Sequence, residues 1–346
     1  MGFHRLGAAL ALAFLAGCSN GSTVVVSTSP HGGAIAAASS GAPLPELGRW
    51  EAQMVLYGLP ACRELERREA TFDERLAATY YDAEWVFYQL ADYTGDREFL
   101  RCAEAAERIY RDKYVEPNRG NIPGFWNFSR GLTEDFLRTG DEASKRAVLS
   151  LAHDAAFARD STSPSETVPV DASREVAYAI MAYLNAEDVG APPRARLSLL
   201  VDHAFGHLDQ WFRGGRAPYV RPFMAALTAQ ALIQYDERYG DPRTLEALTT
   251  AADWLWEHTW LPDAEAFMYT DRVVPSGGQE ASPDLNLLIA PLYGWLYHKT
   301  GEERFAERGD AIFAGGVRGA YLAKPKQFNQ SYRWSIRYVE WRGGGR

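Results

Sequence analysis

A turn built on glycine recurs along this chain and restricts what the chain can fold into. Its clearest copy is Tyr93-Thr94-Gly95-Asp96, where an apolar helical pattern ends, glycine follows and an acidic residue opens the next pattern. Glycine ends a helix in the left-handed conformation at little cost, and the acidic side chain accepts N–H bonds from the next helix. The turn recurs every 45 to 61 residues, with a blurred third copy, around Gly95, Gly140, Gly190, Gly240 and Gly301. Each copy predicts a tight helical hairpin, and a repeat of this length is typical of a helical array or a closed ring of hairpins.

Helical periodicity extends from Glu46 nearly to the end of the chain, and no segment shows a two-residue alternation of strand length. The helices that follow a glycine turn carry charge on one face, whereas those that follow a long loop are richer in aromatic and small residues. The first kind suits an outer layer that faces water, and the second kind suits an inner layer that is buried on all sides. The pattern predicts twelve helices in six pairs, over residues 46–68, 73–93, 97–114, 124–138, 142–159, 172–188, 194–212, 219–238, 242–260, 283–299, 303–320 and 327–341.

Six outer and six inner helices, over about residues 46–341, resemble the (α/α)6 toroid. An open solenoid is the alternative, and the number of pairs together with the aromatic inner helices favours the closed ring. We therefore expect an all-α fold, with an (α/α)6 toroid domain at residues 46–346.

The first 45 residues carry targeting signals rather than a fold. A short basic region, His4-Arg5, precedes an apolar run that is too short to span a bilayer. Leu15-Ala16-Gly17-Cys18 then resembles the lipobox of bacterial lipoproteins, which implies cleavage before Cys18 and lipidation of that residue. We expect a signal peptide at residues 1–17, a flexible tether at 18–45 and a lipid-anchored protein of the bacterial cell envelope. An ordinary secretory signal is the alternative, and the serine after the cysteine favours the outer membrane by analogy with Gram-negative lipoproteins.

The charge and the cysteine content limit which partners and cofactors the chain can bind. The formal net charge of −9 argues against an extended nucleic-acid surface, which needs a basic patch. Cys62 and Cys102 lie in the helical region, and in an oxidising compartment they form either a disulfide or two separate buried thiols. They lack a matching set of histidines, so the sequence predicts no zinc site, and we expect neither a metal nor another cofactor.

The long loops all join the helices at one end, where the inner helices begin, and loops on a rigid scaffold often carry function. We therefore expect chemistry in the first turns of the inner helices. Aromatic rings pack on sugar C–H surfaces, amides and arginines bind hydroxyl groups, and paired carboxylates hydrolyse glycosides. The candidate substrate-binding residues are Trp126, Asn127, Arg130, Arg174, Arg221, Asn286, Asn329, Gln330, Arg333 and Trp334. The candidate catalytic residues are Asp82, Glu175, Asp284, Tyr81 and Tyr332.

These residues give the chain a resemblance to the carbohydrate-active enzymes that are built on (α/α)6 toroids, which include glycoside hydrolases and polysaccharide lyases. The chain matches no single family's catalytic motif, so the resemblance transfers no catalytic assignment. Each candidate also has a purely structural interpretation. Asp284 can complement a helix dipole, Glu175 can pair with a neighbouring helix, and Arg130 can be held by Glu134 four residues on.

Three functions compete. The first is hydrolysis of glycosidic bonds in a poly- or oligosaccharide by two carboxylates, and the arginines suit an anionic sugar. The second is a polysaccharide lyase, with Tyr81 or Tyr332 as the base and asparagine or arginine side chains neutralising a uronate. The third is a non-catalytic polysaccharide-binding lipoprotein of a surface or export machinery, which would keep the aromatic and arginine residues but needs no paired carboxylates.

Overall fold

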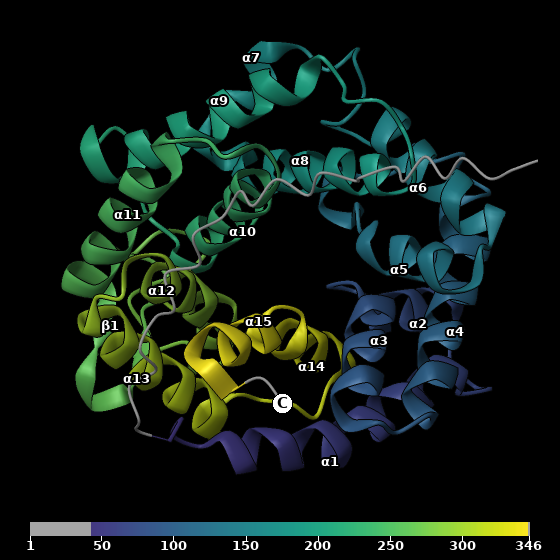
Figure 1. Cartoon of the computed structure of the whole chain (residues 1–346), viewed down its shortest axis with the longest axis horizontal. Helices are drawn as coiled ribbons and strands as arrows, with labels where there is room; N and C mark the ends of the chain where they lie inside the picture. The colour runs from purple at the N-terminus through teal and green to yellow at the C-terminus, as the bar shows by residue number, and fades with distance from the viewer. Residues whose placement is uncertain (1–42, 345–346) are drawn as a thin grey trace, which may run out of the picture. The chain divides into compact units, whose positions relative to one another are not determined.

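Helices make up almost all of the regular structure of this protein (Figure 1). The structure is a computed structural model that describes residues 43–344, and these residues fall in one compact unit. A two-stranded antiparallel ribbon, β1 (Trp260–Leu261) and β2 (Ala266–Phe267), is the one sheet in this part of the chain. The fold class is therefore all-α, as predicted. The α-helices are α1 (Leu47–Glu66), α2 (Phe72–Ala78), α3 (Ala83–Thr94), α4 (Glu98–Tyr110), α5 (Arg130–Thr139), α6 (Glu142–Asp154), α7 (Pro164–Thr167), α8 (Ser173–Asp188), α9 (Arg196–Leu208), α10 (Pro222–Tyr239), α11 (Arg243–Thr259), α12 (Asn286–Thr300), α13 (Glu303–Gly319), α14 (Pro325–Tyr332) and α15 (Ser335–Val339).

The longer helices fall into two classes by burial. Every residue of α12 from Asn286 to Tyr297 is buried, and so is every residue of α8 from Glu175 to Ala186. The helices α4, α6, α9, α11 and α13 each bury one face and expose the other. These two classes agree with the inner and outer helices that the composition predicts.

The inner helices pack against one another in sequence order. The order is α3, α5, α8, α10, α12 and then α14 with α15. Helix α14 also packs against α1 and α3, so helices from both ends of the described chain lie side by side (Figure 1). Trp50 of α1 fixes this junction, because its indole N–H donates to Ser335 Oγ (3.1 Å) and its carbonyl accepts a bond from the Tyr332 hydroxyl (2.7 Å).

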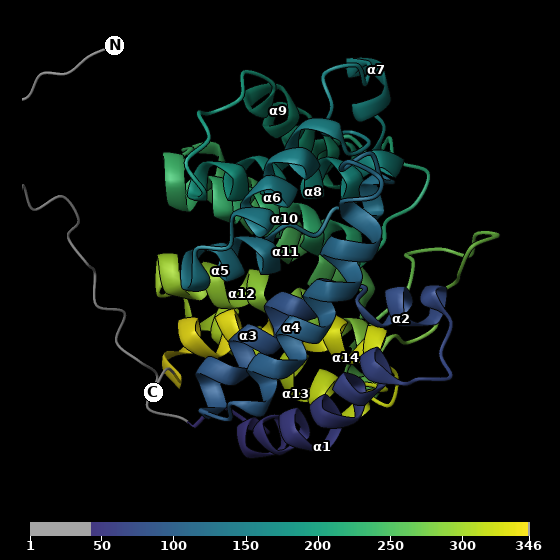
Figure 2. The same ribbon diagram turned by 90° about the vertical axis from the view of Figure 1, so that its right-hand side faces the viewer.

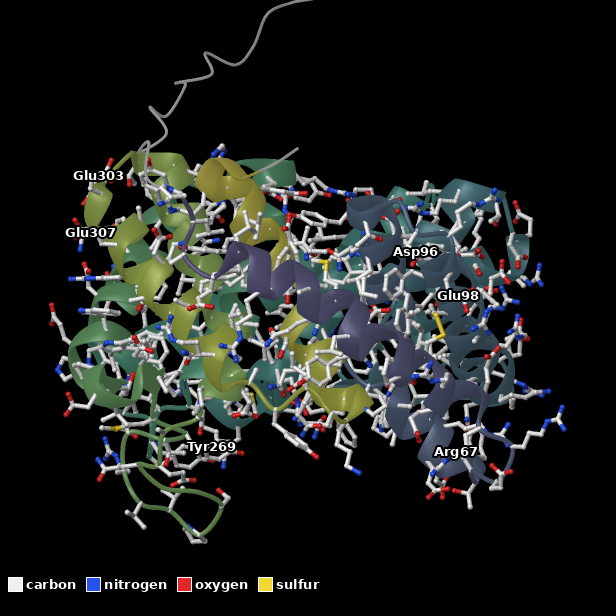
Figure 3. All side chains as sticks on the ribbon, turned by 90° about the horizontal axis from the view of Figure 1, so that it is seen from below. Arg67, Asp96, Glu98, Tyr269, Glu303 and Glu307 are labelled. Carbon is white, nitrogen blue, oxygen red and sulfur yellow. A yellow bond between two sulfur atoms is a disulfide. The ribbon has the colours of Figure 1, made fainter. Side chains whose placement is uncertain are left out.

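The two ends of the inner helices differ. Each of α3, α5, α10 and α12 ends directly at a turning glycine, and we call this the short-turn end. The long connections lie at the other end, which we call the long-loop end. Figure 2 shows the loop after β2 extending away from the helices on the side of α2. In Figure 3, Glu303 and Asp96, which follow two glycine turns, lie toward the side opposite Arg67 and Tyr269, which belong to two of the long connections.

The glycine turns have the predicted conformation. A threonine before three of the turning glycines accepts the backbone N–H of the acidic residue that follows, at 3.1 Å in each case. In the turn after α3, the Asp96 carboxylate then accepts the backbone N–H of Glu98 at 2.9 Å. The turns are therefore closed by their own side chains. All five turning glycines have a positive φ between 69° and 95°: Gly95, Gly140, Gly190, Gly240 and Gly301.

Three of the expected helices are broken or begin late, and a fourth, 142–159, ends early at Asp154. The expected helix 73–93 is interrupted at Tyr80-Tyr81-Asp82, which separates α2 from α3. The expected helix 327–341 is interrupted at Arg333-Trp334, which separates α14 from α15. The expected helix 124–138 begins later, after a 3-10 turn. The helical apolar pattern continues across these breaks, so periodicity alone could not locate them.

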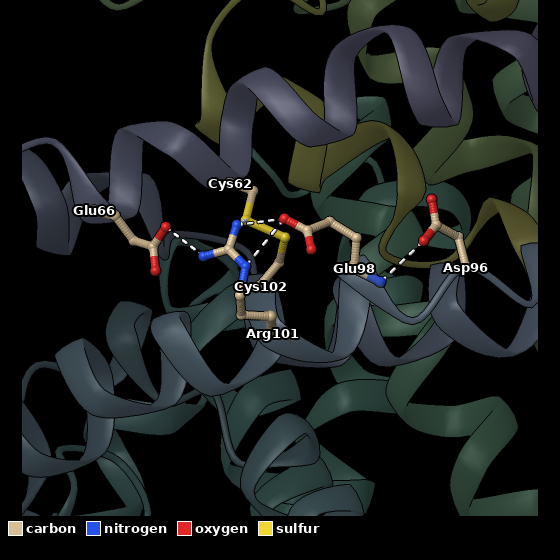
Figure 4. Close-up of a disulfide and its surroundings, with 6 residues drawn as sticks. All are labelled: Cys62, Glu66, Asp96, Glu98, Arg101 and Cys102. Atoms are coloured by element: carbon tan, nitrogen blue, oxygen red, sulfur yellow. Dashed lines mark hydrogen bonds and ion pairs between the residues drawn. A yellow bond between two sulfur atoms is a disulfide. The ribbon is translucent and has the colours of Figure 1, made fainter.

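A disulfide joins Cys62 of α1 to Cys102 of α4 (Figure 4). Their Cα atoms are 5.3 Å apart and both residues are buried. Of the two alternatives that the sequence leaves open, the structure therefore has the disulfide. Closing a loop of this length stabilises the fold by about 4 kcal/mol in the chain-entropy model. Arg101 lies beside the bond and is ion-paired with Glu66 and Glu98 (Figure 4).

The expected signal peptide, Cys18 and nearly all of the expected tether lie outside the described residues. Among residues 43–344, no helix combines the length and the apolar character needed to cross a membrane.

Candidate functional site

The break between α2 and α3 is the most strained point of the inner helices. Tyr81 and Asp82 are consecutive buried residues with φ of 67° and 63°, in the left-handed region that favours glycine. Such a conformation costs about 1–3 kcal/mol per residue, and it persists only where the surroundings enforce it. Asn329 of α14 supplies part of that enforcement, because its Nδ2 donates to the carbonyls of Ala78 and Tyr80, both at 2.9 Å.

The strained backbone places the Asp82 carboxylate between the first turns of α3 and α5. It accepts the N–H of Trp85 at 3.4 Å and the N–H of Gly131 at 3.2 Å. A Cβ atom at Gly131 would lie 2.7 Å from Asp82 Oδ1, so only glycine fits here without a shift. Burial raises the pKa of Asp82, while the charge of Arg333 and the N–H donors of Gly131 and Trp85 oppose that rise. Asp82 is therefore a carboxyl group that is held at a fixed place and holds its proton more strongly than an exposed one.

Arg333 belongs to the second break and faces the first. It is 3% exposed, and its Nη1 donates to the Tyr178 hydroxyl at 3.1 Å. Within residues 43–344, its Nε and both amide atoms of the buried Asn127 have no hydrogen-bond partner. Asp82, Asn127 and Arg333 line a cavity of about 10 Å³, which we call the Asp82 chamber, with further walls from α3, α5, α8 and α10. A space of this size holds about one water molecule.

On the long-loop side of Arg333, the polar groups continue through Tyr178. The charges of Arg333, Arg174 and Glu175 all act on the pKa of this tyrosine, although burial has the largest effect and raises it. Arg174 Nη2 donates to Glu175 Oε1 at 2.7 Å, and among the described residues the buried Glu175 Oε2 has no hydrogen-bond partner. Arg333 and Glu175 thus both act on Tyr178, while Asp82 and Arg333 share the Asp82 chamber.

Aromatic rings surround the same region. Trp126 and Phe128 both pack edge-to-face on the Tyr80 ring, with centroids 4.8 and 5.1 Å away. Lys326 Nζ lies over the same Tyr80 ring, 5.2 Å from its centroid. Trp126 is half-buried, so its ring contributes to the packing as well as to the surface at this end.

A larger cavity, of about 420 Å³, lies on the other side of the Asp82 chamber. We call it the central cavity. Its walls share Trp85, Arg130, Asn185 and Gln234 with the chamber. It also reaches Asp188 in the last turn of α8 and residues 237–238 in the last turn of α10. The cavity therefore lies toward the short-turn end, whereas the sequence directed attention to the long-loop end. Its further lining residues are Gln89, Leu184, Ile233, Trp334, Arg337 and Trp341.

Several predicted substrate-binding residues hold the backbone instead. Both ends of the Asn286 amide bind main-chain groups, with Oδ1 accepting from Phe267 N and Nδ2 donating to the carbonyls of Glu265 and Ile312. Gln330 donates to the Asp284 carbonyl at 2.6 Å. Together with Asn329, these amides fasten the long loops and the broken helix. Their contacts explain the polar residues at these positions without a ligand.

The remaining predicted residues are separated from the Asp82 chamber. Tyr332 is fully buried with its hydroxyl on the Trp50 carbonyl, so it points toward α1. Arg221 binds Ser276 and lies over the rings of two tyrosines in the long-loop region. As far as the described residues go, the chamber lining includes Asp82 but neither Glu175 nor Asp284. The predicted residues that do line the chamber or the central cavity are Asp82, Asn127, Arg130, Arg333 and Trp334.

A separate acidic cluster lies between α4, α5 and α6. Glu107, Asp135 and Asp141 offer carboxylate oxygens within 4.8 Å of one another. The Arg111 guanidinium lies among them and is ion-paired with all three. This cation fills the position that a metal ion would take, so the cluster has a structural explanation.

Most of the residues that line the central cavity are not among those predicted from the sequence. The prediction considered only the first turns of the inner helices. Three amide residues of the cavity stand in the middle or last turns instead: Gln89, Asn185 and Gln234. A signal was present, because an amide side chain on a helix that is otherwise buried is costly unless it has a partner.

Comparisons with protein families, with curated proteins and with solved structures find no match to this chain.

Proposed function

We propose that this protein is a carbohydrate-active enzyme that hydrolyses glycosidic bonds of a poly- or oligosaccharide, on an (α/α)6 toroid. The packing order of the helices supports the toroid. Six inner helical segments follow one another, outer helices alternate with them along the chain, and α14 returns to α1 and α3. The order is the one that a closed ring of six hairpins requires.

The single observation that carries the proposal is the strained placement of Asp82. Two successive left-handed residues hold its carboxyl beside a cavity that shares four lining residues with a space large enough for a ligand. Strain of this kind gathers at active sites, and a raised carboxyl pKa suits a general acid that protonates the leaving oxygen. We assign this role to Asp82, and we assign the role of the second carboxylate to Glu175, which stands in the first turn of α8 outside the Asp82 chamber.

The tyrosines weigh against the lyase alternative. Burial raises the pKa of Tyr81 and of Tyr332 well above the usual tyrosine value. A phenol with such a pKa is a poor base at neutral pH, because very little of it is ionised. The Tyr332 hydroxyl is also committed to the Trp50 carbonyl.

We propose in addition that the protein works in the bacterial cell envelope, anchored by a lipid at Cys18. The lipobox supplies this hypothesis, and the Cys62–Cys102 disulfide supports it, since disulfides persist in oxidising compartments. Radiolabelled palmitate incorporation that is lost in Cys18→Ala would support the anchor, and equal incorporation in both proteins would rule it out.

The experiment that tests the proposed reaction is digestion of a panel of polysaccharides and oligosaccharides. We expect new reducing ends without the ultraviolet absorbance of an unsaturated sugar. Absorbance from an unsaturated sugar would show that the bond is cleaved by elimination, and it would contradict the hydrolase assignment. Binding without either product would show a non-catalytic binding protein.

A further inference from the structure

The central cavity opens at the short-turn end, where the sequence predicts no functional residues. Its volume, about 420 Å³, falls within the range of about 300–1,000 Å³ that is typical of small-molecule sites. Asp188 is the last residue of α8 and Glu237 stands two residues before the end of α10, and a glycine turn follows each helix. The short turns leave this mouth uncovered, because they contain few residues that could cross it.

The charged groups of this wall neutralise one another. Its three arginines each pair with two carboxylates: Arg130 with Glu134 and Asp188, Arg238 with Glu187 and Asp188, and Arg337 with Glu237 and Glu340. Of these five carboxylates, Asp188 and Glu237 line the cavity, and the other three hold the arginines from behind the wall. An anionic sugar would therefore meet no unpaired arginine on this wall.

Uncharged hydrogen-bonding groups occupy the deeper part of the wall. Gln89 and Gln234 contribute side-chain amides to the lining. Gln89 Nε2 donates to the Arg333 carbonyl at 3.2 Å, and Asn185 donates to Ser129 Oγ at 2.8 Å. Beyond them, in the Asp82 chamber, the two amide atoms of Asn127 lack partners among residues 43–344. Unpaired buried amides are costly, and hydroxyl groups that both donate and accept would satisfy them.

Tryptophan supplies the apolar part of the same wall. Trp85, Trp334 and Trp341 come from α3, the break before α15 and the segment after α15. Trp334 and Trp341 pack edge-to-face, with ring centroids 6.2 Å apart. A sugar unit has the matching combination of C–H surface and hydroxyl groups.

We infer that the central cavity is a subsite for an uncharged sugar unit, which enters from the short-turn end. The ligand class rests on the proposed carbohydrate function, while the location and the lack of charge come from the wall itself. The inference replaces the anionic sugar that the arginines favoured at the sequence level, because the arginines of this wall are already paired.

The test is calorimetric titration of the mature protein with three sets of oligosaccharides. The first set is neutral, from glucose, mannose, xylose and galactose polymers, the second is oligogalacturonate and the third is chitosan oligomers. We expect a neutral oligosaccharide to bind, and we expect Gln89→Leu combined with Gln234→Leu to weaken its binding at least about tenfold. Gln210→Leu, on the outer segment after α9, serves as the matched control and should bind as the wild type does.

Two results would overturn the inference. One is binding of the charged oligosaccharides alone, and the other is neutral binding that the double variant leaves unchanged. If the double variant does not fold, as judged by circular dichroism, a crystal structure of the wild type with the bound neutral oligosaccharide decides instead: sugar density in the central cavity supports the subsite, and density elsewhere excludes it.

The outcomes separate this inference from the proposed reaction. Binding through the cavity without release of reducing ends would keep the subsite and reject hydrolysis. Release of reducing ends with binding unchanged in the double variant would keep hydrolysis and reject the subsite.

Discussion

At the short-turn end, the chain closes each turn with residues that are neighbours in sequence, such as Thr94, Gly95 and Asp96. At the long-loop end, side chains from distant helices hold the backbone, as Asn329 holds residues 78–80 and Asn286 holds the loop before α12. The difference teaches that a dense run of polar residues marks where loops need support. The short turns contain few residues, so the central cavity at the short-turn end stays open.

The largest effect should come from the long-loop end, where one amide supports the strained break. Asn329→Leu removes both donors of the Ala78 and Tyr80 carbonyls, so we expect a loss of about 2–5 kcal/mol in the free energy of unfolding, measured by urea denaturation. The matched change at the short-turn end is Thr300→Val, which removes the bond accepted from Glu302 N and the bond donated to the Leu296 carbonyl of the same helix, and it should cost about 1 kcal/mol. Equal losses would remove the distinction between the two ends.

A second comparison uses two helical glycines. In Gly131→Ala, the new methyl group would lie 2.7 Å from both Asp82 Oδ1 and Glu84 Cβ, so we expect destabilisation of about 1–3 kcal/mol and loss of activity. Among the described residues, no atom beyond the neighbouring residues and the backbone of α9 lies within 4 Å of the Cβ position of Gly206, so Gly206→Ala should stabilise by about 0.5–1 kcal/mol. Thermal melts of both variants check the pair, and an unchanged Gly131→Ala melt would contradict the tight fit around Asp82.

The sequence predicted the parts of the fold that depend on neighbours. Gly140 and Gly240 turn as expected because glycine and the adjacent acidic residue act locally. The break at Tyr81-Asp82 could not be predicted, because Asn329, which is about 250 residues away, enforces it. The central cavity could not be predicted either, because its lining residues come from helices that are distant in the sequence and meet only when the inner segments pack together.

For the candidate site, polar residues could be predicted from the sequence, but their contacts could not. Asp82, Asn127 and Arg333 do come together in one chamber. Asn286 and Tyr332 have the same chemistry in the sequence, yet their polar atoms bind main-chain groups. Only the packed structure distinguishes a polar side chain that supports a loop from one that faces a cavity.

A third prediction concerns pH. Burial and the charges of Glu107, Asp82 and Asp135 raise the pKa of Glu84, while Arg111 lowers it, and burial raises the pKa of Glu107 to about 7. A raised folded pKa means that the folded state binds more protons than the unfolded state once the pH exceeds about 4.5. Stability should therefore fall as the pH rises from 5 to 8, by about 2 kcal/mol in thermal melts corrected to one temperature.

The control for this pH effect is the exposed Glu104 of α4. Glu84→Gln mimics the protonated acid, so it should raise the melting temperature at pH 8 and change it little at pH 5. Glu104→Gln should follow the wild type at both values. A Glu84→Gln profile parallel to the wild type would show that Glu84 does not hold its proton.

The smallest expected effect is a gain. Gln230 of α10 is fully buried, and within the described residues neither of its amide atoms has a hydrogen-bond partner. Gln230→Leu should stabilise the fold by about 1 kcal/mol in urea denaturation. A loss of stability would contradict this expectation. It would show that buried water satisfies the Gln230 amide, and that the polar lining of the central cavity continues along α10 from Gln234 to Gln230.

The most direct test of the central claim compares the wild type with Asp82→Asn on an oligosaccharide that both proteins bind. Asparagine can still accept the N–H bonds of Trp85 and Gly131 but cannot supply the proton. The account predicts unchanged calorimetric affinity and at least a hundredfold slower release of reducing ends, which is the usual contribution of a general acid, about 10²–10⁴-fold. Equal rates in the two proteins would contradict it.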